Sequence, residues 1–215
     1  ISDCLVGSEM CIRDRSDIVK APVVGMPLFR YMSDLPRTGK TGTVWNYNTN
    51  ETNLIGEILS RAIDQDLSVY LENKIWQPYG MESEANWMLT YQNGLEYGGC
   101  CLSATLRDYA RLGLFVLDEL KKTPDEDSVL PPGWMRESLS PAQAFNGYGY
   151  FWWLLGDGIY AAEGIFGQVI WIDSKNNLVI ALQSSWRQAW SDSLEAEWMA
   201  FMGALSKELL AGNKL

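Results

Sequence analysis

The sequence contains no histidine. A catalytic triad of serine, histidine and aspartate needs that side chain, and so does a zinc site of the H-E-x-x-H type. Both kinds of site are therefore excluded within these 215 residues.

Positive charge and long apolar runs are also scarce. The chain has 17 lysines and arginines against 27 aspartates and glutamates, which gives a formal net charge of -10. Because an acidic chain repels phosphate backbones and anionic membrane surfaces, neither nucleic acid nor a membrane is expected as a partner. No apolar run approaches the roughly 18 residues that a membrane span needs. The length suits one large domain or two small ones.

Cysteine occurs at four positions, 4, 11, 100 and 101, and no C-x-x-C spacing suggests a metal site. The adjacent Cys100 and Cys101 are poorly placed to pair with each other, because disulfide partners normally need freedom to face one another. Buried free thiols are therefore expected.

Residues 1–15 read ISDCLVGSEMCIRDR and show neither strand nor helix periodicity. The string resembles translated sequencing adapter, so we interpret it as a non-native segment and leave it out of the fold argument. On this interpretation, residues 16–215 are the C-terminal part of a longer domain, and everything upstream of about Ser16 is missing. A natural disordered N-terminus is the alternative.

Helices and strands are predicted in separate parts of the chain. Helical spacing of apolar residues predicts helices over residues 54–63, 68–76, 105–117 and 192–210, with Asn50 as the first N-cap and a short helical stretch after 131–134. Strand patterns cover residues 148–155, 159–162, 167–173 and 178–184, with a hairpin turn at 176–177. A helical region over about 44–140, followed by an antiparallel sheet and a final helix over about 145–212, makes an α+β fold.

The most specific signal is WNYNTNETNLIG, from Trp45 to Gly56. Tyr47 lies on a loop directly before a predicted helix, whose positive N-terminal end favours a phenolate. A phenolate can take the proton of a serine nucleophile and return it to the leaving group. A buried structural tyrosine with a bonded hydroxyl is the alternative.

A second signal is YAAEGIFGQVIWID, from Tyr160 to Asp173. Gly164 and Gly167 flank Ile165, and glycines at such positions let the backbone approach a substrate carbonyl. The alternative is a strand that merely begins with glycines.

Together these stretches resemble the β-lactamase-like, penicillin-recognising serine hydrolases over roughly residues 16–210. The Tyr47 stretch is similar to the second motif of that family. Residues 164–167, GIFG, are similar to the third motif in the branch that includes 6-aminohexanoate-oligomer hydrolases. Residues 75–81 resemble the Pro-Leu-Gly-Met turn of the family, and residues 98–111 resemble its Gly-Gly…Ser-Thr-x-x-Asp-x-Ala-Arg helix.

The resemblance implies a β-lactamase/transpeptidase-like fold, with an antiparallel sheet flanked by helices and a helical subdomain, incomplete at the N-terminus. It implies hydrolysis of a small amide or ester through an acyl-enzyme, with no metal or organic cofactor. Proton transfer falls to Tyr47, and an N–H of the oxyanion hole falls to Ile165. The expected substrate contacts are Thr49, Trp152, Gly164, Gly167 and Gln168.

Two departures from the family pattern matter. The nucleophile motif Ser-x-x-Lys occurs nowhere in the chain, so we expect the chain by itself to be inactive. The triplet Lys40-Thr41-Gly42 matches the Lys-Thr-Gly of many relatives but precedes the tyrosine motif instead of following it, and we interpret it as a solvated turn. The alternative function is that of a non-catalytic relative which binds peptide or cell-wall fragments. The sequence leaves the oligomeric state and the cellular compartment open.

A geometric expectation follows if both motifs serve one active site. The hydroxyl of Tyr47 and the N–H of Ile165 should face one cleft, within about 10 Å of each other. That cleft should be open where the missing serine helix would dock, should expose apolar residues there and should not contain Lys40.

Overall fold

The computed structural model describes residues 28–34, 36, 43–123 and 125–212. The segment 1–15 and the triplet Lys40-Thr41-Gly42 lie outside these residues. The helices are α2 (Leu28–Asp34), α3 (Thr49–Ile63), α4 (Leu67–Leu71), the π-helical η1 (Glu72–Trp76), α5 (Leu106–Lys121), α6 (Trp134–Ser138) and α7 (Asp192–Gly212). The strands are β1 (Asn86–Trp87), β2 (Leu102–Ser103), β3 (Trp153–Gly156), β4 (Ile159–Gly164), β5 (Gln168–Asp173) and β6 (Leu178–Leu182).

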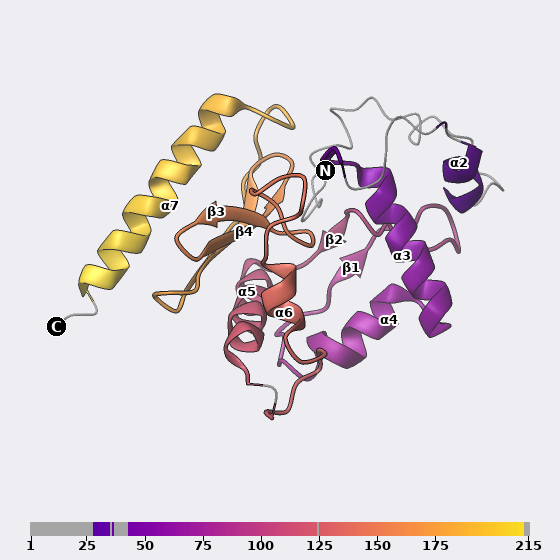
Figure 1. The fold of residues 1–215 in the computed structure, drawn as a ribbon, viewed down its shortest axis with the longest axis horizontal. Coiled ribbons are helices and arrows are strands. Elements are labelled where there is room, and N and C mark those ends of the chain that lie inside the picture. Colours follow the sequence, from indigo (N-terminus) through magenta and orange to yellow (C-terminus); the bar gives the residue numbers. More distant parts are fainter. Residues whose placement is uncertain (1–27, 35, 37–42, 124, 213–215) are drawn as a thin grey trace.

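The main sheet has four antiparallel strands in the order β3-β4-β5-β6, and α5 and α7 lie beside it (Figure 1). Its two faces alternate along each strand. One face packs against buried residues of α5, and the other packs against Trp198 and Met202 of α7. The predicted α+β fold, with its sheet covered on both faces, is therefore confirmed.

Helix α5 begins as predicted. The side chain of Thr105 accepts a hydrogen bond from the backbone N–H of Asp108, which satisfies one of the free donors at the helix start. Gly113 brings the helix close to the sheet, because an added Cβ there would lie 2.5 Å from Cγ1 of Val179 and 2.8 Å from Cγ2 of Ile170. A larger residue would push α5 away from β5 and β6.

The strand predicted over residues 148–155 is wrong at its beginning, because β3 starts only at Trp153. Phe151 has a φ of 65°, in the left-handed region, which interrupts an extended chain. The backbone N–H of Tyr150 donates to the carbonyl of Ser138 at 2.8 Å instead of joining the sheet. A Cβ on Gly149 would lie 2.1 Å from that same carbonyl oxygen, so the turn needs glycine there.

Helix α3 differs from its prediction in two ways. Its N-cap is Asn48 and not Asn50, because Asn48 is extended and its side chain accepts from the N–H of Asn50. Three apolar side chains of the helix face outward: Ile55, Ile58 and Leu59 are 48%, 51% and 41% exposed. The buried side is polar or small and consists of Thr49, Asn50, Asn53, Gly56, Glu57 and Ser60.

The polar side of α3 is fixed by the segment before β2. A Cβ on Gly56 would lie 2.8 Å from the Cα of Gly98, so the two backbones are in direct contact. The N–H of Gly99 donates to Oδ1 of Asn53 at 2.7 Å. The contact between α3 and this loop is therefore made by two glycine backbones and a hydrogen bond.

The expectation of free thiols at Cys100 and Cys101 is wrong, since the structure joins them in a disulfide between adjacent residues. Cys101 adopts a φ of 76°, which is unusual for a residue with a side chain. The expected burial is confirmed, with exposures of 8% and 9%. Cys4 and Cys11 lie outside the described residues.

Replacing Gly98 by alanine should destabilise the chain. The new Cβ would meet the Cα of Gly56 and the carbonyl oxygen of Thr52, both at 2.9 Å, and neither backbone atom can move away cheaply. We expect the free energy of unfolding in urea to fall by about 1–3 kcal/mol, the usual cost of overpacking. Gly203→Ala on α7 is the control, because nothing lies within 4 Å of its added Cβ. Equal stability of the two variants would contradict the contact.

Candidate active site

Tyr47 lies at the positive end of α3. It immediately precedes the N-cap Asn48, and Thr49 and Asn50 of the first turn are buried. The free backbone N–H groups of a helix N-terminus and the helix dipole favour negative charge at this place. The position predicted for the tyrosine, on a loop in front of a helix, is the one that the structure shows.

Aromatic rings connect Tyr47 to the sheet. Its ring stacks on Trp153 of β3, with centroids 5.7 Å apart and planes 11° apart, and it meets Tyr148 edge-on at 5.7 Å. Trp45 contacts the same group of rings, at 6.1 Å from both Tyr47 and Trp153. The Tyr47 ring is half-buried and its hydroxyl oxygen is buried. The loop before α3 is thus fixed against the edge strand of the sheet.

The Gly164–Gly167 segment forms the turn between β4 and β5, closed by the pair Gly164 and Gln168. Ile165 is 3% exposed. Phe166 and Gly167 have φ values of 65° and 86°, so the turn requires the left-handed conformation twice in succession.

A later segment, residues 184–190, covers this turn. The N–H of Phe166 donates to the carbonyl of Ala189, and the N–H of Trp186 donates to the carbonyl of Phe166, both at 3.1 Å. An added Cβ on Gly167 would lie 2.3 Å from the Trp186 ring. The absence of a side chain at Gly167 therefore allows the indole of Trp186 to pack against the turn. The sequence alone did not suggest this role.

The two motifs are joined through neighbouring strands. Trp153, which stacks on Tyr47, pairs with Ala161 of β4, and β4 ends at Gly164. Ala161 and Ile165 are four residues apart, or about 13 Å at strand spacing. Tyr47 thus contacts β3, the strand that pairs with the one leading into the Gly164–Gly167 turn. That the Tyr47 hydroxyl and the Ile165 N–H face one cleft within about 10 Å remains a prediction.

The expected substrate contacts have different surroundings. Trp152 is half-buried and packs against the apolar residues between α5 and the sheet, whereas its neighbour Trp153 contacts Tyr47. Gln168 donates through Nε2 to the carbonyl of Ser184 at 2.9 Å. From the aromatic stretch 148–153 the sequence singled out Trp152, whereas the structure places Trp153 and Tyr148 against Tyr47.

Three buried polar atoms in this region have no hydrogen-bond partner among the described residues: Oγ1 of Thr49, Oε1 of Gln168 and Nε1 of Trp153. Buried polar atoms in folded proteins are almost always hydrogen-bonded. Two of these residues, Thr49 and Gln168, are among the substrate contacts expected from the sequence.

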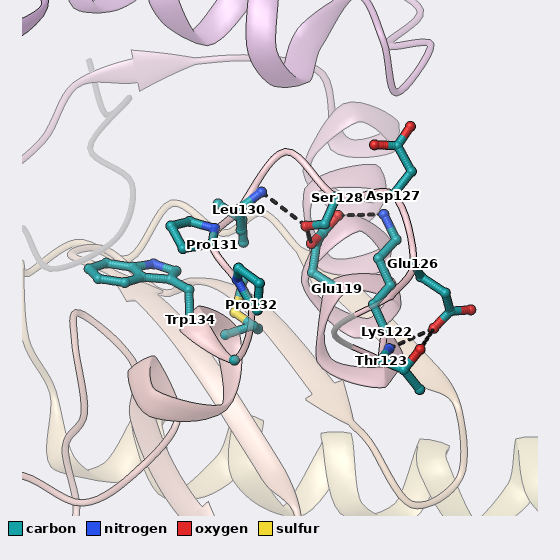
Figure 2. A pocket seen from close by; sticks show the side chains of 12 residues that line it. Glu119, Lys122, Thr123, Glu126, Asp127, Ser128, Leu130, Pro131, Pro132 and Trp134 are labelled. Carbon is teal, nitrogen blue, oxygen red and sulfur yellow. Dashed lines mark hydrogen bonds and ion pairs between the residues drawn. The ribbon is translucent and has the colours of Figure 1, made fainter.

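A small cavity of about 210 Å³ lies between the end of α5 and the loop before α6 (Figure 2). Two of its charged side chains form an ion pair. Lys122 donates to Glu119 at 2.7 Å, and this bond raises the pKa of Lys122 above its ordinary value. Ser128 also donates to Glu119. The cavity contains none of the expected site residues, and we assign no function to it.

A larger apolar cavity of about 380 Å³ lies beside α3. Its walls come from α3, α4, η1, α5 and the segment around Cys100 and Leu102, with Phe151 and Ile170 also lining it. Neither Tyr47 nor Ile165 lines this cavity.

Over the described ranges, no group of three histidine, cysteine, aspartate or glutamate side chains could hold a metal ion. Within the same ranges no helix is both long and apolar enough to cross a bilayer.

The chain is 26% identical over 196 residues to a 6-aminohexanoate-dimer hydrolase of Paenarthrobacter ureafaciens, covering 83% of this chain and 49% of that protein. It therefore spans about half the length of this curated relative.

Two solved structures share the fold. One, named as a candidate 6-aminohexanoate-dimer hydrolase of Bacillus anthracis, has a TM-score of 0.73 at 24% identity, over 86% of this chain and 49% of that chain. A β-lactamase of Mycobacterium bovis has a TM-score of 0.65 at 15% identity, over 96% of this chain and 86% of that chain. The Beta-lactamase family itself matches residues 15–201. The chain belongs to the β-lactamase family.

Proposed function

We propose that this chain is the C-terminal part of a serine hydrolase that cleaves amide or ester bonds through an acyl-enzyme. The serine and lysine of a Ser-x-x-Lys motif come from a segment upstream of this chain. Tyr47 and Ile165 are the contributions of this chain to the reaction.

The reaction runs in two halves. The serine oxygen attacks the substrate carbonyl while its proton passes to the lysine and Tyr47 pair, and the N–H groups of Ile165 and of the serine hold the oxyanion. The tetrahedral intermediate collapses, and the proton goes to the leaving amine or alcohol. Water then attacks the acyl-serine with the same groups as base and acid, which releases the carboxylic acid and restores the serine.

The observation that carries this proposal is the packing of Tyr47 on Trp153. It fixes the tyrosine of one motif against β3, whose neighbour β4 ends at the glycine of the other motif. An independent structural tyrosine would not need to contact this particular strand. The unpartnered buried atoms of Thr49, Gln168 and Trp153 add support, because a substrate or an upstream segment could satisfy them.

The outward apolar face of α3 also supports an upstream segment. Ile55, Ile58 and Leu59 form an exposed apolar surface next to the larger cavity, which Ile55 and Leu59 also line. An exposed surface of this kind normally meets another protein surface. We assign it to the segment that carries the nucleophile.

The proposed substrates are small linear amides or esters in preference to β-lactams. The curated relative is named for the 6-aminohexanoate dimer, which is a linear amide, and residues 164–167 match the third motif of that branch. Fold similarity alone would not distinguish these substrate classes.

The purified 215-residue chain should not hydrolyse p-nitrophenyl acetate or butyrate above the rate of its Tyr47→Phe variant. Without a serine and lysine one helical turn apart, Tyr47 has no nucleophile to deprotonate. Release of p-nitrophenol followed at 405 nm measures the rate. Saturable turnover with an initial burst would overturn the assignment of the nucleophile to an upstream segment.

A further inference from the structure

We propose that the Cys100–Cys101 disulfide is a reversible thiol–disulfide exchange site, which small thiols reach through the apolar cavity beside α3. This inference concerns chemistry outside the hydrolase motifs, and it is stated for the 215-residue chain, in which Ile55 and Leu59 at the cavity are exposed.

The position of the two sulfur-bearing residues defines the route of access. Cys100 and Cys101 are 8% and 9% exposed, so little of either residue meets the outer surface. Cys100 lines the cavity of about 380 Å³, and Cys101 does not. A reagent small enough to enter between α3 and α5 therefore meets Cys100 first.

The exchange balances with two thiol molecules. The thiolate of the first attacks Sγ of Cys100, the bond between the two protein sulfurs breaks, and Cys101 leaves as a thiolate that takes up a proton. The thiolate of the second attacks the external sulfur of the mixed disulfide, which frees Cys100. Two small thiols become one external disulfide, and the protein gains two electrons and two protons.

Reduction of the disulfide affects the residues that are hydrogen-bonded to its backbone. Nε1 of Trp87 donates to the carbonyl of Cys100 at 2.9 Å, and the N–H of Met88 donates to the carbonyl of Cys101 at 3.0 Å. Cys101 also holds a φ of 76°, which L-residues rarely adopt without a constraint. Reduction removes the constraint on this residue, and Trp87, which lines the same cavity, reports the rearrangement.

Peptide mapping tests the disulfide directly. Trypsin cleaves after Lys74 and Arg107 and nowhere between them, so one peptide of residues 75–107 carries both cysteines and neither Cys4 nor Cys11. After alkylation with iodoacetamide in denaturant, this peptide should carry no added group. Prior treatment with dithiothreitol should give the doubly alkylated form. Full alkylation of protein purified and digested without reductant would overturn the proposal.

The route of access is tested with two matched substitutions. Ile55 lines the cavity and is 48% exposed, while Leu114 on α5 is 49% exposed and does not line it. Reduction of the folded chain by dithiothreitol should slow by about threefold or more in Ile55→Trp, because exchange rates depend on access to the sulfur. The Leu114→Trp rate should match that of the unmodified chain.

Each outcome decides the proposal. If reduction is slower in Ile55→Trp alone, and tryptophan fluorescence changes as the disulfide is reduced, access through the cavity is supported. Equal rates in both variants mean that the sulfur is reached from elsewhere and overturn the proposed route. Circular dichroism of each variant before the assay ensures that only folded chains are compared.

Discussion

Replacing Tyr47 by phenylalanine in a protein that joins this chain to its Ser-x-x-Lys segment should lower kcat by about 100-fold or more, with a smaller effect on KM. The phenyl ring can still stack on Trp153, so the packing of the loop before α3 should survive. Only the hydroxyl that moves the serine proton is lost. Steady-state hydrolysis of a p-nitrophenyl ester and of a linear amide measures the effect.

Tyr160→Phe is the matched control for this experiment. Tyr160 of β4 is also half-buried, and it packs against the apolar residues between α5 and the sheet. Its loss of a hydroxyl should leave kcat within a factor of about two, since most changes away from the reacting groups have little effect. If Tyr47→Phe also stays within that range, Tyr47 is a structural residue and its proposed role is wrong.

Replacing Asp108 by alanine should have the largest effect on stability. Asp108 is fully buried, and its carboxylate accepts hydrogen bonds from the backbone N–H groups of Glu82 and Ser83 at 2.7 and 3.2 Å. It also accepts from the hydroxyl of Thr105 at 2.8 Å and lies 3.6 Å from the guanidinium of Arg111. Removing it leaves these donors without their acceptor, and we expect a loss of about 3–5 kcal/mol in the free energy of unfolding.

Urea unfolding followed by circular dichroism measures this loss. Asp108→Asn keeps one acceptor oxygen and should lose about 1–3 kcal/mol. The exposed Asp125 provides a surface control, for which a change to alanine should stay within about 0.5 kcal/mol. A loss in Asp108→Ala no larger than that of the surface control would show that the 82–83 turn is held by other contacts.

Sequence reasoning predicted well the features that depend on neighbours along the chain. The start of α5 beside Thr105, the hairpin turn at Asn176 and Asn177 and the start of α7 at Asp192 all follow from local hydrogen bonding or spacing. The Asn48 cap was assigned two residues late, because asparagine at either position fits the same rule and only the backbone conformation selects one.

Features set by distant contacts were less predictable. The outward orientation of Ile55, Ile58 and Leu59 was not evident, since helical spacing identifies an apolar face without showing what covers it. The left-handed φ of Phe151 shortened a predicted strand for reasons that lie in the contact of Gly149 with Ser138. The stacking of Tyr47 on Trp153 joins positions far apart in the sequence, and no local rule relates them.

The order β3-β4-β5-β6 has a consequence for the way in which the chain folds. Each strand pairs with the next one in the sequence, so the sheet closes only short loops and loses little chain entropy in doing so. The contact of Gly56 with Gly98 closes a much longer loop and contributes no apolar burial of its own. Topologies rich in local contacts form fast. We therefore expect the sheet to form early, and α3 to reach its final position only after the loop before β2 has formed.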